Sequence, residues 1–208
     1  MKLTKRQRII CENIPNVKSF ADIGCDHGLI SYFVATNIAN VVYATDISKP
    51  SLHKAEILCK DLSNVEFILT DGLKGVPKVE CVCICGMGGM EIKEILINGT
   101  YKPKYLVLQP MRDSEELRRF LKEEYKFIKD FTFIDKNKFY DLMVLKRGKD
   151  KLTKNEISFG RTNLIEKSED FIKKLEYIKK EKIKLINKGI NIKENQKMIE
   201  RINKIYED

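Results

Sequence analysis

The sequence predicts an α/β fold: a mainly parallel sheet of seven strands with an antiparallel last strand, followed by a helical hairpin. Three observations predict it. Short apolar segments alternate with amphipathic ones through residues 19–146. Two of these segments, VVYATDI and VECVCICG, are almost continuously apolar, which is typical of strands covered on both faces. After residue 148 the chain becomes rich in Lys and Ile, with Ile at helical spacing.

The first half of the chain predicts four strands, each followed by a turn or a helix. The strands are expected at 19–23, 41–47, 65–70 and 79–85. One helix is expected over 29–36. A second runs from the capping residue Ser48 to about Leu62, with Pro50 in its first turn. A third is expected over 91–97, where Asn98-Gly99 stops it.

The second half predicts one more parallel strand and a strand pair joined by a short turn. These strands are expected at 105–108, 127–135 and 140–146. Ser114 is the expected cap of a helix that reaches about Glu124, and Asp113 is the rival cap. Helices between strands imply right-handed parallel crossovers, whereas the short turn at 136–138 makes one of the last two strands antiparallel.

Two units are expected, a domain at 1–148 and a helical appendage at 149–208. Residues 148–160 are polar and predict a linker. Beyond it, Ile and Leu recur at helical spacing on both sides of Gly189. Two helices joined near 187–191 would fold back as an antiparallel coiled-coil hairpin, and one continuous long helix is the alternative.

Composition and charge limit which classes of protein and which partners fit this chain. The chain of 208 residues has 39 Lys+Arg and 30 Asp+Glu, a net charge of +9, which favours a polyanionic partner. Residues 149–208 carry a net +5 (16 minus 11) and residues 1–148 a net +4 (23 minus 19). No apolar run reaches the roughly 20 residues that span a bilayer. The N-terminus does not read as a signal peptide, so we expect a cytoplasmic protein without membrane contact.

The cysteines predict core packing and no metal site. There are six, none in a C-x-x-C pair, and only two histidines. Cys81, Cys83 and Cys85 alternate along a predicted strand, so all three would point to one face and fill it as small hydrophobic side chains.

The loop after the first strand, ADIGCDHG (21–28), carries the strongest candidate site. Gly24 ends a strand at the edge of the sheet where nucleotide-like ligands bind, and it allows close backbone approach. Asp22 and Asp26 disfavour a pyrophosphate and favour a ligand with a cationic centre, such as a sulfonium bearing an amino group. The loop lacks G-x-G-x-x-G, so a nicotinamide oxidoreductase is a weak alternative.

Polar residues at the other strand ends extend this site. Asp46 follows Gly24 by 22 residues, a spacing that suits an acid accepting both hydroxyls of a ribose. Asp71-Gly72 closes the third strand and offers an acceptor for an adenine amino group. GMGGM (86–90) follows the fourth strand, and its backbone would line a pocket against a flat base or the methyl donor. Gln109 follows the fifth strand and could hydrogen-bond a base edge, while Pro110 stiffens the loop.

The motifs ADIGCDHG, TDGL, CGMGG and LQP, in this order and spacing, resemble the bacterial TrmK family. These enzymes are S-adenosylmethionine (SAM)-dependent methyltransferases that act on N1 of adenine-22 in tRNA. The resemblance implies a Rossmann-like class I methyltransferase fold, SAM as cofactor and tRNA as partner. It covers about residues 3–148, and the helical tail matches the family's coiled-coil appendage in kind. Family members usually carry Asn after Gln-Pro, where this chain has Met111.

The resemblance and the strand ends together give the candidate residues. Those expected to bind the cofactor are Asp22, Gly24, Asp46, Ile47, Asp71, Gly72 and Gly86. Asp26 is the expected catalytic acid, and His27 is the alternative for handling the proton. Those expected to bind substrate are Gly88, Gly89, Gln109, Pro110, Arg112, Lys5 and Arg8. Further candidates for phosphate contacts are Arg6, Arg118, Arg119 and the lysines of the tail.

The expected reaction is attack by the adenine N1 lone pair on the methyl carbon, with catalysis resting on positioning and a preorganised polar site. The adenine would have to leave its stack. Two other readings remain: a methyltransferase for another RNA, a protein or a small molecule, and a non-catalytic relative that binds SAM or RNA. A monomer is favoured.

Overall fold

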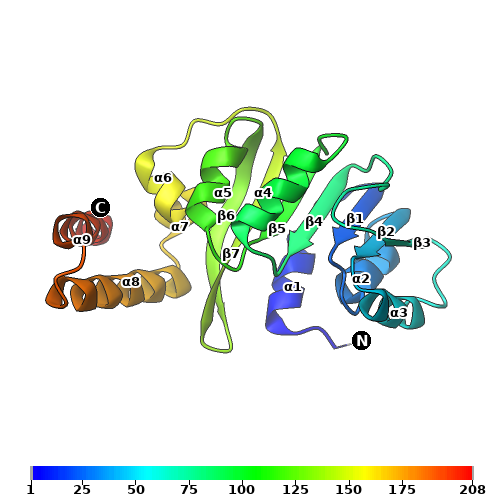
Figure 1. Ribbon diagram of the computed structural model, residues 1–208, viewed down its shortest axis with the longest axis horizontal. Helices are drawn as coiled ribbons and strands as arrows, with labels where there is room; N and C mark the ends of the chain where they lie inside the picture. The colour runs from blue at the N-terminus through cyan, green and yellow to red at the C-terminus, as the bar shows by residue number, and fades with distance from the viewer. Residues whose placement is uncertain (1, 208) are drawn as a thin grey trace.

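A computed structural model describes residues 2–207 and contains a seven-stranded sheet in the order β3-β2-β1-β4-β5-β7-β6 (Figure 1). The strands are β1 Ser19–Ile23, β2 Val41–Asp46, β3 Val65–Leu69, β4 Cys81–Cys85, β5 Tyr105–Gln109, β6 Tyr125–Asp135 and β7 Lys138–Arg147. Neighbours from β3 to β5 are parallel, and β7 runs antiparallel to both β5 and β6. The predicted fold class is confirmed.

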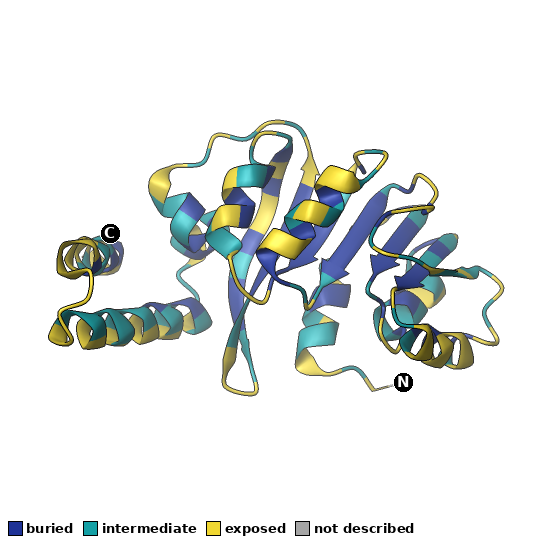
Figure 2. Cartoon of the chain, viewed as in Figure 1, coloured by how far each residue is buried: buried dark blue, intermediate teal, exposed yellow. Residues whose placement is uncertain are grey.

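Helices cover both faces of the sheet. They are α1 Lys5–Glu12, α2 Leu29–Asn37, α3 Lys49–Leu58, α4 Gly89–Asn98, α5 Ser114–Leu121, α6 Lys154–Phe159, α7 Arg161–Glu166, α8 Glu169–Asn187 and α9 Ile192–Glu207. Helices α1 and α2 pack on one face, where Ile10 and Val34 meet Phe20. Helices α4 and α5 pack on the other, where Ile92 and Leu117 meet Ile23. The sheet is therefore buried on both sides through its centre (Figure 2).

The alternating cysteines of β4 lie in the core. Cys81 and Cys83 are fully buried on the face covered by α1 and α2, and Cys85 lies half-buried at the end of the strand. Burial raises the pKa of the Cys81 thiol, so it packs as a neutral side chain. No group of His, Cys, Asp and Glu within residues 2–207 is arranged to hold a metal ion. Over the same residues, every helix is too short or too polar to cross a bilayer.

Several element ends differ from the prediction. Helix α3 ends at Leu58, four residues early, and α4 begins at Gly89 instead of 91. Asp113, the rival cap, occupies the N-cap position of α5 with φ 58°, and its side chain makes no capping bond. The predicted linker at 148–160 is wrong in part, because α6 lies inside it. Thr153 and Glu156 form the capping box of that helix.

The C-terminal segment folds back on itself, as predicted, and is not one long helix. The chain turns after α8, where Gly189 has φ 73°, and α9 returns along α8. Lys179 Nζ donates to Asn203 Oδ1 over 2.7 Å, and Ile202 packs with Leu175. A small apolar cluster between the two helices therefore holds the hairpin together.

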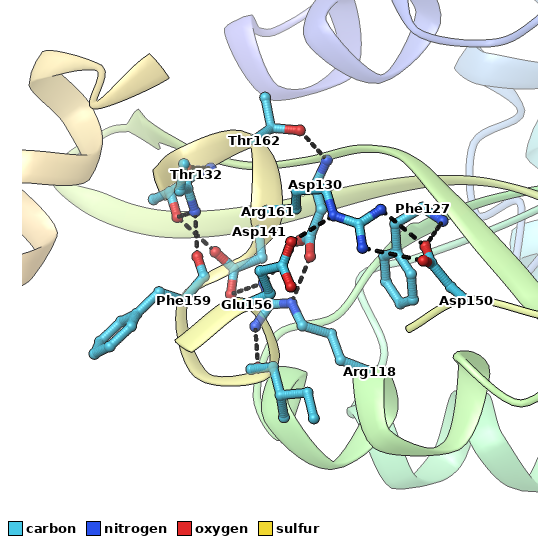
Figure 3. A network of polar contacts seen from close by, with 12 residues as sticks. Arg118, Phe127, Asp130, Thr132, Asp141, Asp150, Glu156, Phe159, Arg161 and Thr162 are labelled. Carbon is cyan, nitrogen blue, oxygen red and sulfur yellow. Dashed lines mark hydrogen bonds and ion pairs between the residues drawn. The ribbon is translucent and has the colours of Figure 1, made fainter. Parts of the chain in front are cut away.

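A buried ion pair joins α5 to the outer strands of the sheet (Figure 3). Arg118 is 1% exposed, and its Nε and Nη2 donate to the two carboxylate oxygens of Asp130 over 2.8 and 2.9 Å. Its Nη2 also lies 3.5 Å from Asp141 Oδ2. The expectation that Arg118 contacts phosphate is wrong, because its guanidinium is buried and paired with two carboxylates, Asp130 on β6 and Asp141 on β7.

The same cluster fastens the helical appendage to the sheet. Asp141 accepts from Lys174 of α8 over 2.6 Å and from Thr132 over 2.7 Å. Burial alone would raise the pKa of Asp141, but Lys174 and Arg118 hold it well below its usual range. Asp170 of α8 accepts the backbone N–H of Ile134 over 2.8 Å. These contacts anchor the first turns of α8 on β6, while the domain boundary at residue 148 stays a prediction.

Candidate functional site

A cavity of about 450 Å³ lies at the carboxyl ends of β1, β2 and β4. Figure 1 shows the carboxyl ends of these strands, drawn as arrowheads, at the edge of the sheet beside α1. The strand order reverses at β1: β2 and β3 follow on one side of it, and the chain then returns from β3 to β4 on the other side. Ligands of open α/β sheets bind at such a point.

The loop after β1 is bonded to β2 and packs against the loop after β4. The backbone N–H groups of Gly24 and Cys25 both donate to the Thr45 carbonyl, over 2.9 and 2.8 Å. Gly24 has φ +73°, and a Cβ there would collide with the methyl group of Met87. The left-handed backbone conformation therefore favours glycine at this position, and a larger residue would also displace the Met87 methyl group.

Asp46 at the end of β2 is 9% exposed and is oriented by the backbone of two loops. Its Oδ2 accepts the N–H of Asp26 over 3.0 Å, and its Oδ1 accepts the N–H of Ser48 over 2.8 Å. Each carboxylate oxygen can accept a second hydrogen bond. Asp46 therefore offers two fixed acceptors, which suits a pair of neighbouring hydroxyl groups.

Asp22 is a buried carboxylate at the bottom of the site. It is 3% exposed and accepts from the Ser31 hydroxyl over 2.7 Å. Burial raises its pKa to about 6, although the Ser31 hydrogen bond opposes the shift; nearby Asp46 adds to the rise. A cationic ligand group beside Asp22 would lower this pKa again.

Asp26 and His27 lie together at the rim. Asp26 has φ 49°, in the left-handed region, and its Oδ2 is 2.8 Å from His27 Nδ1. Both side chains are more than half exposed. The pair is open to a large substrate, and the carboxylate can orient the ring.

Ile47, Asp71 and Gly72 line the opposite end of the cavity. The side chain of Ile47 is 73% exposed, which is unusual for a residue that directly follows a core strand. Gly72 has φ +65°, and a Cβ there would lie 3.2 Å from Ile95 of α4. Ile47 and Ile95 make this part of the lining apolar beside the exposed carboxylate of Asp71, a combination that fits a nucleobase.

The cavity wall is strongly acidic. Five carboxylates line it, namely Asp22, Asp26, Asp46, Asp71 and Glu91, and the only Lys or Arg in the lining is Arg6. Such a wall attracts a cation and repels phosphate. Together with the paired acceptors of Asp46 and the apolar part of the lining, it fits SAM, which carries a sulfonium, an amino group, a ribose and an adenine.

The structure brings one set of predicted residues together and leaves another set outside. All the residues expected to be catalytic or to bind cofactor line the cavity: Asp22, Gly24, Asp26, His27, Asp46, Ile47, Asp71, Gly72 and Gly86. None of those expected to bind substrate lines it: Lys5, Arg8, Gly88, Gly89, Gln109, Pro110 and Arg112.

The excluded residues have other surroundings. Gly88 and Gly89 are buried under the loop after β5, and a Cβ on Gly89 would lie 2.6 Å from the Asp113 carbonyl oxygen. Gln109 and Pro110 are buried below the same loop, and Arg112 points to solvent. These residues shape the loop, and it is Met111 that reaches the cavity.

The sequence reasoning missed several lining residues. Gln7 comes from α1, Met87 and Glu91 come from the loop after β4 and from α4, and Ile95 lies one turn further along α4. Met87 and Glu91 follow the predicted strand end directly, so their position was a usable signal. Gln7 had no such signal, because only the packing of α1 on the sheet brings it to the site.

Comparisons with known proteins agree with this geometry. A family model described as tRNA (adenine(22)-N(1))-methyltransferase matches residues 20–207. The Bacillus subtilis protein of that name is 32% identical over 190 residues, covering 84% of this chain and 80% of that protein. A Mycoplasma pneumoniae protein is 36% identical over 132 residues, which span 61% of this chain and 62% of its own length.

A solved structure extends the likeness to the whole chain. The structure of M. capricolum TrmK in complex with S-adenosylhomocysteine is similar to this chain with a TM-score of 0.85 and 28% identity. The similarity covers 100% of this chain and 97% of that one, so it includes the helical hairpin as well as the sheet.

Proposed function

The chain belongs to the tRNA (adenine(22)-N(1))-methyltransferase family, and we propose from this premise that it methylates N1 of adenine-22 in tRNA with SAM as donor. The observation that carries the proposal is the acidic cavity at the ends of β1, β2 and β4. Its chemistry matches the donor, and the family match supplies the acceptor.

Each part of the cavity has a role toward SAM. Asp46 accepts the two ribose hydroxyl groups, and the apolar part of the lining beside Ile47 and Gly72 takes the adenine, with Asp71 accepting from its amino group. Asp22 faces the cationic end of the donor. SAM, when bound, supplies a methyl group on a positively charged sulfur.

The residues at the rim serve the acceptor base. The adenine N1 lone pair forms the new bond to the methyl carbon as the carbon–sulfur bond breaks, so no base is needed before attack. The ring then carries a positive charge. Asp26 stabilises that charge or accepts a proton from the exocyclic amino group, and His27 is oriented by Asp26 to help.

The remaining partners follow from the same premise. A chain with net charge +9 attracts the tRNA backbone, and phosphate contacts fix its register. We place the enzyme in the cytoplasm, since all six cysteines are free thiols, as is typical of a reducing compartment. We expect it to act as a monomer.

The test is methyl transfer from labelled SAM to unmodified tRNA, followed by nucleoside analysis. The expected product is 1-methyladenosine, lost when adenine-22 is replaced by guanine. Methylation of another nucleoside would overturn the position, and SAM binding with no transfer to any tRNA would overturn the activity. The Asp46→Ala variant serves as a control in which donor binding is weakened.

A further inference from the structure

Arg6 is a guanidinium without a carboxylate partner in a cavity with acidic walls. It lies in the first turn of α1, is half-buried, and lines the cavity, whereas its neighbours Lys5 and Arg8 are exposed and do not. Within residues 2–207 its side chain makes no ion pair, and its Nη1 has only the Met111 sulfur, 3.9 Å away. A charge that no protein group neutralises is available to a ligand.

The hairpin of β6 and β7 holds Arg6 in place. The Arg6 backbone N–H donates to Asp135 Oδ2 over 3.2 Å. The guanidinium lies over the Tyr140 ring, 5.7 Å from its centroid, and that ring stacks on Phe133 at 5.5 Å. A guanidinium held on an aromatic face keeps its N–H edge free for hydrogen bonds.

Arg6 lies on the β4–β5 side of the cavity, away from the position that we assign to the ribose of the donor. Its Nη1 lies 3.9 Å from where a Cβ on Gly86 would lie, at the end of β4. Its other neighbours, Met111 and Tyr140, follow β5 and belong to β7. Asp46, which we assign to the ribose of the donor, closes β2 on the far side of β1.

We propose that Arg6 binds the phosphate next to the target adenosine and so admits one nucleotide of a polyanion to an acidic cavity. The inference rests on the proposed function and deepens it. Five carboxylates would repel the backbone of the approaching RNA, and Arg6 is the one cation in the lining that faces it. The other basic residues of the surface bind remote phosphates and do not serve this step.

The first test compares Arg6→Gln with Lys78→Gln, which also removes one positive charge but lies exposed before β4, outside the cavity lining. RNA binding is measured by fluorescence anisotropy without SAM, over a salt series, and SAM binding by calorimetry. For Arg6→Gln we expect affinity for a stem-loop carrying the target adenine to fall about tenfold, and the slope of log K against log salt to fall by about one. SAM affinity should not change.

The second test locates the phosphate. A methylphosphonate, which is uncharged, replaces the phosphate on either side of the target adenosine, one at a time. At one of the two positions we expect the methylphosphonate to raise the KM of the wild-type enzyme for the RNA about tenfold. The KM of Arg6→Gln should be the same for the modified and the unmodified RNA. Arg6→Lys keeps the charge without the paired N–H groups, so its affinity for unmodified RNA should lie between those of wild type and Arg6→Gln.

The outcomes separate this inference from the function it rests on. If the methylphosphonate raises KM equally in wild type and in Arg6→Gln, the proposed role of Arg6 is overturned, and the methyltransferase activity is not. A drop in SAM affinity with RNA affinity intact would assign Arg6 to the donor carboxylate instead, and would also overturn it. Absence of methylation of any tRNA by wild-type enzyme would overturn the proposed function itself.

Discussion

Asp46 and Asp26 are joined by one hydrogen bond, yet their proposed roles differ and can be separated. Asp46→Ala removes the acceptors assigned to the ribose and also frees the N–H groups of Asp26 and Ser48. We expect SAM affinity to fall at least tenfold in calorimetry, about 1.4 kcal/mol. Asp26→Ala leaves those acceptors in place, so SAM affinity should hold while kcat falls roughly a hundredfold. Normal SAM affinity in Asp46→Ala would refute the assignment.

Asp22 predicts a pH dependence of cofactor binding. Its pKa of about 6 without ligand lies above the 3.8 of a free carboxyl, and a cation beside it would lower that pKa. Below pH 6 a proton must therefore leave as the cation binds. We expect SAM affinity to rise about tenfold from pH 5 to pH 7 and to level off above pH 6. In Asp22→Asn the profile should be flat, and a wild-type profile without a slope would show that Asp22 does not face the cation.

At the residue scale, the sequence predicted the positions of the acidic site residues but not the surroundings of the basic ones. Asp22, Asp46 and Asp71 lie at or beside strand ends, so the position of the strand also places the side chain. A basic residue on a helix carries no such information. Arg118 and Arg119 look alike in sequence, and only the distant Asp130 and Asp141 make the first a buried core residue.

Helix α5 offers a direct comparison of these two arginines. Arg118→Met leaves the buried Asp130 without its cation, while Asp141 keeps Lys174, and we expect it to lower the free energy of unfolding by about 3–5 kcal/mol. Arg119→Ala removes only exposed pairs with Glu115 and Glu116, so a change within about 0.5 kcal/mol is expected. Urea denaturation of both variants is the measurement. Similar midpoints for the two would mean that the buried pair contributes little.

At the element scale, the strands were predicted well and the helices beyond residue 148 only in part. The strands have period-two or continuous apolar patterns that depend on local sequence. Helix α6 has six residues, too few to show a period, although Thr153 and Glu156 carried the signature of its start. Its docking on α5 through Arg118 and the Ile157 carbonyl depends on contacts distant in sequence.

For the whole molecule, net charge sets the response to salt. A chain with +9 that neutralises several phosphates releases counterions when tRNA binds. We therefore expect KM for tRNA to rise steeply, by a power law, between about 50 and 200 mM salt. Affinity for SAM in the same buffers should change little, because SAM carries far fewer charges than tRNA and its binding releases few counterions. A salt-independent KM would favour a small-molecule acceptor.

The topology of the whole molecule followed from alternating strands and helices and from the short turn before β7. The position of α1 did not. Its sequence predicts an amphipathic helix equally well anywhere on the sheet. Contacts with residues distant in sequence place it beside the cavity: Ile10 packs in the core with Phe20, and the Arg6 N–H donates to Asp135 of the β6–β7 hairpin. Sequence patterns therefore predicted the strand-end residues that line the cavity, while the residues that α1 brings to it, Arg6 and Gln7, depend on long-range packing.

The acidic wall has a consequence for turnover. A methyl cation equivalent passes from sulfur to a ring nitrogen, so the total charge between the walls is the same before and after the step. The five carboxylates face one positive charge before, during and after the transfer, and that charge moves by only a few bond lengths. The dipoles and carboxylates around it need little rearrangement. After the transfer, S-adenosylhomocysteine has no net charge and the methylated adenine is cationic. The acidic walls therefore favour release of S-adenosylhomocysteine first and slow the release of the methylated base.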